Sequence, residues 1–302
     1  MSFETESRSP ETCRRVGLIG VGLMGHGIAR NLLLYGHELY FLDHAGNQPV
    51  DDLLAVGAIP LRSAAEVAAR SEVVIICVTG TPQVEAVLFE PEGVLAGINA
   101  GTLVIDCSTA IPSTTRCIEE RLRNQGVRFL DAAMTRTPKE AEEGRLNLIV
   151  GASDELFAEV KPLLEAFAEH ITHAGPVGMG HQVKLLHNYV SLGFCAVLAE
   201  AVAVGRRAGI DAEVLVEVLG NGGGGGAAFE RLKPFILTDD PSGFRFSLCN
   251  ALKDLDYYTQ MAGELRAPHQ VSDSVGGLYR QVTEQGHGEA IVPELIDLLA
   301  RD

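Results

Sequence analysis

The sequence has no tryptophan, few aromatic residues and a shortage of basic ones. Lysine and arginine number 24 against 40 aspartates and glutamates, so the formal net charge is −16. This balance argues against nucleic acid or an anionic membrane as a partner, because both attract positive protein surfaces. It does not exclude a small anionic substrate, which a few local cations can bind.

The six cysteines form no CxxC pair and show no spacing typical of metal ligands, so we expect no metal site. Cys77 and Cys107 end apolar runs, where buried free thiols are common. No unbroken apolar run reaches the roughly 18 residues of a membrane span. Met1–Glu11 is polar, lacks the apolar core of a signal peptide and is predicted to be a disordered tail. These features together favour a reducing, cytoplasmic location.

Near its start the chain contains a complete nucleotide-binding pattern: a strand, a glycine-rich turn, a helix, and a second strand that ends in an acidic residue. An apolar strand over Val16–Gly20 leads directly into Gly20-Val21-Gly22-Leu23-Met24-Gly25. The helix that follows ends at Gly36, and a second strand ends in Asp43, 23 residues after Gly20. A GxGxxG motif in this full context predicts a dinucleotide-binding turn, with the phosphates at the helix N-terminus.

Each residue of this turn has an expected role in cofactor binding. Gly20 would make the tight turn, Gly22 would let the backbone approach the pyrophosphate, and Gly25 would allow close helix–strand packing. Leu23 and Met24 lie between them and are included in the predicted cofactor site. Asp43 can accept hydrogen bonds from both ribose hydroxyls, and its charge would repel a 2′-phosphate. We therefore expect NAD as the cofactor, with NADP less favoured because His44 stands where an arginine would suit the phosphate.

The α/β alternation continues to about residue 174 and predicts a Rossmann-type domain over residues 14–174. Strands at Val73–Val78 and Thr102–Asp106 end in Thr79-Gly80 and Ser108-Thr109. Because the carboxyl ends of parallel strands face the ligand crevice, Thr79, Gly80, Ser108 and Thr109 are candidates to line the dinucleotide. A helix-capping role for Thr109 is the alternative.

A polar stretch, Asp131 to Gly144, follows the next strand and is predicted to be a loop. Arg136 stands between Thr135 and Thr137, and its guanidinium could bind an anion through two hydrogen bonds. The same residue could equally be a solvated loop arginine.

A lysine opens the second half of the chain. Gly178 and Gly180 allow a tight turn, and the helix that begins there carries Lys184 and Asn188 four residues apart, on one face. Apolar neighbours such as Val183 and Leu186 would desolvate the amine and favour its neutral form. Such a lysine could give or take a proton near neutral pH.

Residues 175–302 are predicted to form an all-helical domain for substrate binding and oligomerisation. A long helix over 182–208 carries an apolar stripe, and further helices are expected at 212–219, 227–235, 248–262, 271–285 and 292–300. The run Gly222–Gly226 cannot hold a helix and is predicted to be a connection. The whole chain is thus α/β, a Rossmann domain followed by an all-α domain.

Over residues 15 to 300 the chain resembles the β-hydroxyacid dehydrogenase family. The matching segments are Gly17–Gly25, Asp106-Cys107-Ser108-Thr109 with Pro112, Asp131-Ala132, the GxGxxxKxxxN pattern at 178–188, and Lys253-Asp254-Leu255. The resemblance implies that Lys184 is the catalytic lysine and that Asn188 and Thr109 contact substrate. It also implies a nicotinamide or substrate contact for Lys253, and a homodimer or homotetramer built around the long helix.

Departures from the family bear on the substrate. Most members have Ser-Gly-Gly, whose amides bind the substrate carboxylate, where this chain has Thr135-Arg136-Thr137. A guanidinium there suggests a larger or more strongly anionic group. Arg136 and Thr137, with Asn188, Tyr189 and Ser191, are similar to the sulfolactaldehyde reductase branch, whose substrate ends in a sulfonate. His187 replaces the usual asparagine, and either adds positive charge or packs under the loop.

The sequence therefore predicts an NAD(H)-dependent enzyme that interconverts a small anionic β-hydroxyacid and its semialdehyde. Sulfolactaldehyde, succinic semialdehyde and glyoxylate are alternative substrates. An imine reductase is a further possibility, although that branch commonly has Asp or Tyr in place of Lys184. The last alternative is a non-catalytic dinucleotide-binding module, and the presence of Lys184 argues against this one as well.

Overall fold

The computed structural model describes residues 13–300, so the predicted disordered tail at Met1–Glu11 lies outside the described part. The chain divides into two compact units, the first ending at Lys184 and the second beginning at Leu185. The predicted boundary after residue 174 falls before this division, at the end of the last strand of the sheet.

The first unit is built on one eight-stranded sheet with the order β3-β2-β1-β4-β5-β6-β7-β8. All neighbouring strands are parallel except β6 and β7. The strands are β1 (Arg15–Ile19), β2 (Glu38–Leu42), β3 (Ile59–Leu61), β4 (Val73–Ile76), β5 (Leu103–Asp106), β6 (Arg128–Thr135), β7 (Leu146–Gly151) and β8 (Ala168–Gly175). Strand order reverses direction at β1 and β4, which is where such sheets bind ligands. The predicted Rossmann-type fold is confirmed.

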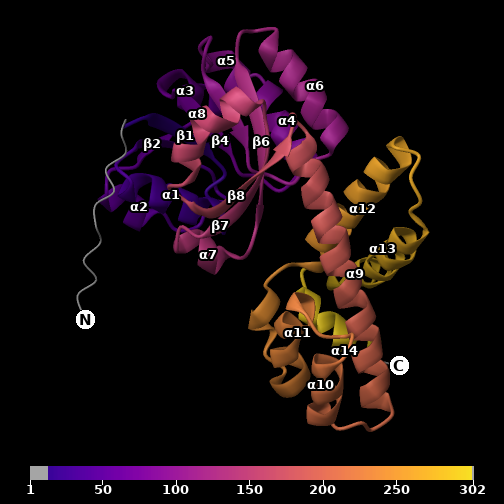
Figure 1. The fold of residues 1–302 in the computed structure, drawn as a ribbon. Helices are drawn as coiled ribbons and strands as arrows, with labels where there is room; N and C mark the ends of the chain where they lie inside the picture. Colours follow the sequence, from indigo (N-terminus) through magenta and orange to yellow (C-terminus); the bar gives the residue numbers. More distant parts are fainter. Residues whose placement is uncertain (1–12, 301–302) are drawn as a thin grey trace. The chain divides into compact units, whose positions relative to one another are not determined.

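Helices of the first unit lie around this sheet (Figure 1). They are α1 (Gly25–Leu34), α2 (Asp51–Ala55), α3 (Ala64–Arg70), α4 (Thr81–Phe89), α5 (Val94–Gly97), α6 (Pro112–Arg123), α7 (Pro138–Glu142) and α8 (Asp154–Leu164). Every residue of β4 and β5 is buried, as expected for strands covered on both faces.

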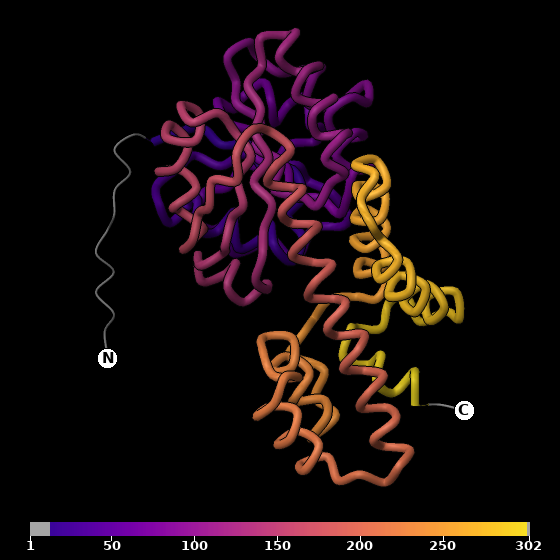
Figure 2. Tube along the Cα trace, turned by 45° about the vertical axis from the view of Figure 1, so that its right-hand side comes forward, coloured from indigo at the N-terminus to yellow at the C-terminus, as the bar shows by residue number. Residues whose placement is uncertain are grey.

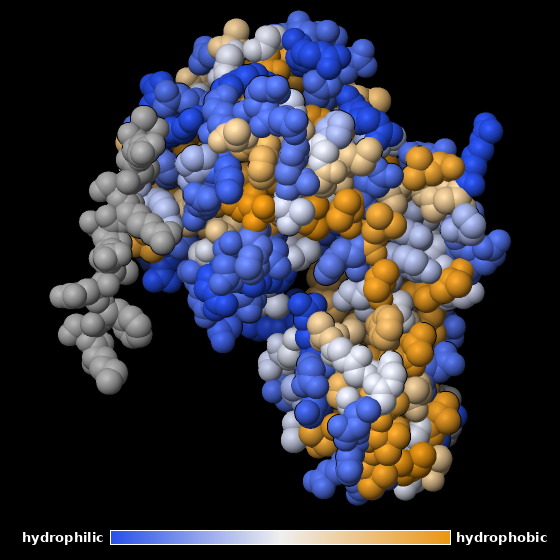
Figure 3. Space-filling model, viewed as in Figure 1, coloured by the Kyte–Doolittle hydropathy of each residue, from blue (hydrophilic) through white to orange (hydrophobic). Residues whose placement is uncertain are grey.

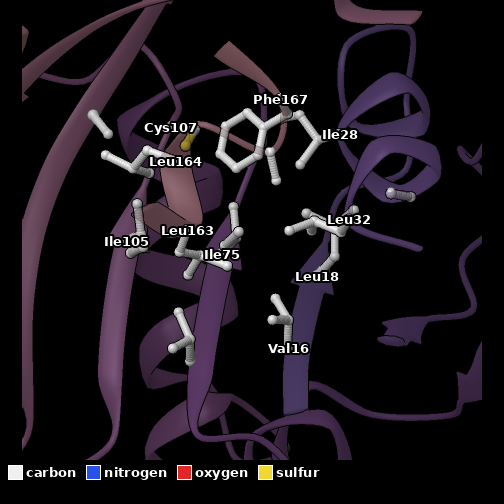
Figure 4. Packing of buried hydrophobic residues seen from close by; sticks show 14 of the residues in the cluster. Val16, Leu18, Ile28, Leu32, Ile75, Ile105, Cys107, Leu163, Leu164 and Phe167 are labelled. Atoms are coloured by element: carbon white, nitrogen blue, oxygen red, sulfur yellow. The ribbon is translucent and has the colours of Figure 1, made fainter. Parts of the chain in front are cut away.

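Two apolar clusters, one for each face of the sheet, hold the first unit together. Alternate strand residues such as Leu18, Ile75 and Ile105 belong to one cluster, in which Phe167 lies beside Ile28 (Figure 4). Intervening residues such as Ile19, Val74 and Val104 belong to the other. Burying each of these side chains stabilises the fold by about 1.5–3 kcal/mol. The carboxyl ends of β1, β4 and β5 are thereby held in fixed register.

The predicted loop over Asp131–Gly144 is wrong at both ends. Strand β6 continues to Thr135, because Asp131–Thr135 pairs with the antiparallel strand β7. A short helix, α7, then begins behind a capping box made by Thr137 and Glu140. Polarity suggested a loop, but pairing with a strand later in the chain decided the conformation. The short elements α2, β3 and α5 were likewise not predicted.

The second unit is all-helical, as predicted. Its helices are α9 (Met179–Arg207, which begins in the first unit), α10 (Ala212–Asn221), α11 (Ala227–Thr238), α12 (Leu248–Glu264), α13 (Gln270–Val282) and α14 (Leu295–Ala300). Leu192, Phe229, Leu248 and other buried residues pack around Tyr279, whose hydroxyl donates to the Leu192 carbonyl. The trace of α9 is unbroken along its 29 residues (Figure 2).

The apolar stripe predicted on α9 faces outward. Val190, Val197 and Val204 are 57%, 68% and 62% exposed, whereas Leu192, Ala199 and Val202 are buried. Apolar residues of α9 and α10 gather on the surface seen in Figure 3. Among the described residues, α9 is also the one helix long and apolar enough to span a membrane, but half of its most apolar window is buried in the protein. A core helix passes the same test, so this is a weak indication.

Candidate functional site

The glycine turn after β1 has the geometry of a dinucleotide cradle. Gly20 has φ +100°, and a Cβ there would lie 2.1 Å from the Cys77 carbonyl oxygen, so no other residue fits the turn. A Cβ at Gly25 would lie 1.9 Å from the Gly20 oxygen, whereas a Cβ at Gly22 would meet no protein atom within 4 Å. The backbone is therefore packed on one side at Gly20 and Gly25 and open at Gly22, where a pyrophosphate needs access.

Helix α1 begins at this turn and suits a phosphate. All residues of its first turn belong to the described part of the chain. None of them is acidic, and no side chain caps the backbone N–H groups there. The partial positive charge of its N-terminus is thus available to an anion. Leu23 is 57% exposed beside the open side of the turn, and Met24 packs against the sheet core. Both positions are compatible with the predicted cofactor site.

Asp43 follows β2 next to β1, and its side chain is exposed. The loop after it is tied to the glycine turn by Asn47, whose Oδ1 accepts from the Val21 N–H while its Nδ2 donates to the Leu42 carbonyl. His44 is also exposed, and its Nδ1 accepts from the Gly46 N–H. Asn47 is a supporting residue that sequence reasoning missed, because nothing in its neighbourhood marks it as facing the turn.

The loops after β4 and β5 are connected to each other. Ser108 is buried, its Oγ accepts from the Val78 N–H at 3.0 Å, and its own N–H donates to Asp106 Oδ1 at 2.9 Å. Thr109 is half-buried and Thr79 exposed, while Gly80 is buried at the start of α4. Ser108 therefore supports the loop through its hydroxyl, and Thr109 is the more accessible of the two.

A charged cluster behind the glycine turn was not predicted. His26, in the first turn of α1, contacts Glu142 Oε1 through Nδ1 at 2.9 Å and Asp52 Oδ1 through Nε2 at 3.1 Å. Burial lowers the pKa of His26, but the hydrogen bonds and charges of Glu142 and Asp52 outweigh it, so the pKa is raised. Asn31 adds three hydrogen bonds, to the carbonyls of Gly27, Ala141 and Glu142. Helix α1 is thereby fastened to α2 and α7.

Lys184 lies half-buried near the start of α9. Asp131 anchors that helix start, since its Oδ1 accepts from the Gly178 N–H at 2.6 Å and its Oδ2 from the His181 N–H at 2.7 Å. A Cβ at Gly180 would lie 2.4 Å from the Ile149 oxygen, which explains the second glycine. Of the apolar neighbours expected to desolvate Lys184, Leu185 is buried, but Val183, Leu186 and Val190 are exposed. Lys184 itself is half-buried, and the neutral form expected for it stays a prediction.

Within the second unit, a buried carboxylate orients the predicted substrate-side residues. Asp254 Oδ2 accepts from Asn188 Nδ2 at 2.6 Å, and Lys253 Nζ lies 3.1 Å from Asp254 Oδ1. Asn188 Oδ1 in turn lies 2.9 Å from His187 Nδ1. Asp254 is 1% exposed, so this carboxylate is buried. Asn188 and Lys253 thus meet at one buried carboxylate, and the exposed His187 joins them through Asn188.

Two further predicted residues follow on α9. Tyr189 is half-buried and stacks on Tyr258, with ring centroids 4.1 Å apart. Ser191 is half-buried one turn further along the helix from His187. The stacking gives Tyr189 a packing role within the second unit, and contact of either residue with substrate stays a prediction.

Arg136 and Thr137 have structural partners where they stand. The Arg136 guanidinium pairs with Glu169 and donates to the Arg145 carbonyl, and its φ of +82° is unusual for a residue with a side chain. The Thr137 N–H donates to Glu140 Oε2 at 3.0 Å, as part of the capping box at the start of α7. The anion-binding role of Arg136 therefore has to compete with a carboxylate that is already present.

Within residues 13–300, no group of three or more His, Cys, Asp or Glu side chains is placed to hold a metal ion. Cysteines 13, 77, 107, 117, 195 and 249 are all free. Burial raises the pKa of Cys77, with a further contribution from Asp106, to about 12, so this thiol is not a nucleophile near neutral pH.

Comparison with known proteins assigns each half of the chain. Residues 15–175 match the family model described as the NAD-binding domain of 6-phosphogluconate dehydrogenase. Residues 178–299 match the one described as NAD-binding of NADP-dependent 3-hydroxyisobutyrate dehydrogenase.

Individual relatives agree with both models. An NAD-dependent L-serine dehydrogenase of Pseudomonas aeruginosa is 32% identical, over 94% of this chain and 98% of the relative. A 3-sulfolactaldehyde reductase of Escherichia coli is 30% identical, over 90% and 91%. The solved 3-hydroxyisobutyrate dehydrogenase of Mycobacterium tuberculosis with L-serine superposes with a TM-score of 0.85, at 25% identity, over 96% of this chain and all of that one.

Proposed function

The chain belongs to the β-hydroxyacid dehydrogenase family of NAD(P)-dependent oxidoreductases, and on this premise we propose that it interconverts a small anionic β-hydroxyacid and its semialdehyde. The observation that carries the proposal is the anchoring of the Lys184 helix. Asp131 binds two backbone N–H groups at the start of α9 and so fixes the turn from which Lys184 projects. A lysine on a helix fixed in this way is suited to proton transfer.

In this proposal the nicotinamide, when bound, supplies or accepts hydride. Lys184 exchanges a proton with the substrate oxygen, as an acid in reduction and as a base in oxidation. Asn188, held by Asp254, hydrogen-bonds the substrate and orients it. The pyrophosphate would lie against Gly22, Leu23 and Met24. Further contacts with the substrate and the nicotinamide would come from Thr109 and Lys253.

A substrate panel tests the proposal. Sulfolactaldehyde, succinic semialdehyde, tartronate semialdehyde, methylmalonate semialdehyde and glyoxylate should each be assayed with NADH and NADPH, and L-serine with NAD. We expect turnover with at least one of these acids. Quenching of NADH fluorescence without turnover on any of them would instead favour the non-catalytic dinucleotide-binding module. Turnover of a cyclic imine in preference to every acid would favour the imine reductase alternative.

Arg136 is proposed to select the anionic end of the substrate. Arg136→Ala should raise KM for anionic substrates by one or more tenfold steps, each about 1.4 kcal/mol, because the guanidinium supplies a paired hydrogen bond. Steady-state kinetics on the best sulfonate and the best carboxylate measures the effect. Arg145→Ala is the matched control, since Arg145 also approaches Glu169, at 3.6 Å, and is not a candidate contact. Equal KM values for the two variants would show that Arg136 serves the Glu169 contact alone.

We propose NAD as the preferred cofactor. The exposed carboxylate of Asp43, at the end of β2, can bind the ribose hydroxyls and repel a 2′-phosphate. Asp43→Ala should therefore lower the ratio of kcat/KM for NADH over NADPH by tenfold or more, about 1.4 kcal/mol. Glu38→Ala, at the opposite end of the same strand, is the control. An unaltered ratio in Asp43→Ala would mean that cofactor choice rests elsewhere, in keeping with the NADP named in one family model.

We further propose a homodimer or homotetramer. Val190, Phe194 and Val197 form an exposed apolar stripe on α9, 57%, 48% and 68% exposed, which is unusual for a surface that stays in water. A second copy of the chain is the expected occupant. Sedimentation equilibrium should give a mass at least twice 32.2 kDa, and Val197→Glu should lower it. A monomer at micromolar concentration would contradict this proposal.

We also propose a cytoplasmic location, which rests on the sequence alone.

A further inference from the structure

Three charged or polar side chains are buried together at the start of the Lys184 helix. Asp106, Asp131 and His181 are all 0% exposed and lie in the first unit. Asp106 ends β5 and Asp131 lies in register with it on β6. His181 comes from the first turn of α9, three residues before Lys184. Burying such groups is costly unless each serves a partner, so their contacts are informative.

Each carboxylate holds one of the two segments that carry predicted site residues. Asp106 Oδ1 accepts from the Ser108 N–H and so shapes the loop of Ser108 and Thr109. Asp131 accepts from the Gly178 and His181 N–H groups at the start of α9. Burial raises the pKa of Asp131, while the charge of His181 and the two backbone N–H groups lower it in part.

The His181 ring lies between the two carboxylates. Its Nδ1 lies 2.8 Å from Thr115 Oγ1 and 3.9 Å from Asp131 Oδ2, and its Nε2 lies 3.9 Å from Asp106 Oδ2. Because the Thr115 hydroxyl donates to the Ile111 carbonyl, Nδ1 is the donor to Thr115. Among the described residues, neither Nε2 nor Asp106 Oδ2 has a hydrogen-bond partner. The two atoms therefore lie 3.9 Å apart within the buried cluster.

We propose that His181 is a positioning residue that couples the loop carrying Thr109 to the helix carrying Lys184, a role that rests on the function proposed above. In this proposal the ring, at ion-pair distance from Asp106 Oδ2, links the end of β5 to the first turn of α9, and Thr115 on α6 fixes its orientation. Loss of this tie leaves Lys184 on a helix that no longer keeps its place relative to the Thr109 loop. A displacement of about 1 Å can cost as much as 10²-fold in rate, so the effect on turnover is large.

A graded set of variants tests the role. His181→Leu removes both ring nitrogens, His181→Gln keeps a donor near the position of Nε2, and Thr115→Val removes the hydroxyl that orients the ring. His269→Gln is the control, since His269 is 40% exposed and bonds Asp273 on its own helix. We expect kcat of His181→Leu to fall about 10- to 100-fold. KM values, NADH affinity and Tm should stay near wild type, and His181→Gln should recover most of kcat.

Hydrogen–deuterium exchange gives a readout that does not need turnover. Peptides covering residues 107–111 and 176–184 should both exchange faster in His181→Leu than in the wild type, and both should recover in His181→Gln. Unchanged exchange in either segment, or an unchanged kcat, would overturn the proposal. A fall in kcat that comes with lost NADH binding and a lower Tm would overturn it too, because that result describes a merely structural residue.

The two proposals fail in different ways. An inactive wild type on the whole substrate panel refutes the proposed function, while exchange in the two segments still decides the coupling. If His181→Leu does not fold, Thr115→Val tests the coupling instead. Valine has the shape of threonine, and this variant keeps the His181 side chain. It should accelerate exchange in the same two segments, and wild-type exchange there would refute the coupling.

Discussion

Lys184→Ala should lower kcat at least about 10²-fold, the lower end of the loss expected when a proton-transfer group is removed. NADH affinity should barely change, because the lysine acts on the substrate oxygen and the nucleotide is held by the glycine turn. Stopped-flow reduction of the best semialdehyde, with NADH fluorescence as the signal, separates binding from the chemical step. The loss should appear in the chemical step.

Lys161→Ala is the matched control, since Lys161 is half-exposed on α8 and pairs only weakly with Glu165 at 3.9 Å. It should leave kcat unchanged. Lys184→Arg is informative as well, because arginine keeps the charge but stays protonated and cannot act as a base. An acid that cannot lose its proton cannot donate one either, so this variant should slow oxidation of the hydroxyacid and reduction of the semialdehyde alike. Wild-type turnover in Lys184→Ala would remove Lys184 from the mechanism.

Gly22→Ala and Gly25→Ala should separate cofactor binding from folding. At Gly22 an added methyl meets no protein atom within 4 Å, so the fold should tolerate it while it occupies the side where the pyrophosphate must approach. We expect Tm near wild type and an NADH Kd raised at least about tenfold, or 1.4 kcal/mol. Isothermal titration calorimetry and a melting curve on the same sample measure both quantities.

Gly25→Ala should behave in the opposite way. Replacing a helical glycine by alanine gains up to about 1 kcal/mol in helix propensity, but the new Cβ would lie 1.9 Å from the Gly20 carbonyl oxygen. That contact forces α1 away from the turn, so the clash outweighs the propensity and Tm should fall by several degrees or more. Gly263→Ala, on α12, is the control because its Cβ would meet nothing within 4 Å. Equal melting temperatures for Gly22→Ala and Gly25→Ala would contradict the packing described at the turn.

Much of the fold could be predicted because the signals are local. The strand, glycine turn and helix around Gly20–Gly25 follow one another within a few residues, and the helices of the second unit show their period directly in the sequence. The stretch over Asp131–Gly144 could not be predicted in this way. Its strand conformation depends on pairing with β7, and its short helix α7 depends on a single capping box.

Residues of the site fell into two groups for the same reason. Gly20, Gly22, Gly25 and Lys184 stand in motifs whose spacing carries their chemistry. Asp254, Asn47 and His26 do not, because their roles come from partners 66, 26 and 116 residues away in the chain. The exposed apolar stripe of α9 is a further example of what sequence cannot predict. The helical period identifies an apolar face but does not say what that face packs against.

By itself, the sequence determined the fold class, the glycine turn and the lysine helix, since each depends on conformational preferences that operate over a few neighbouring residues. Only the tertiary structure decided how these parts are supported. It placed Asp106, His181 and Asp131 together beneath α9 and gave Arg136 a carboxylate partner. The physical reason is that strand pairing and burial bring together residues that are distant in the chain, and the cost of burying a polar group then requires each one to find a partner.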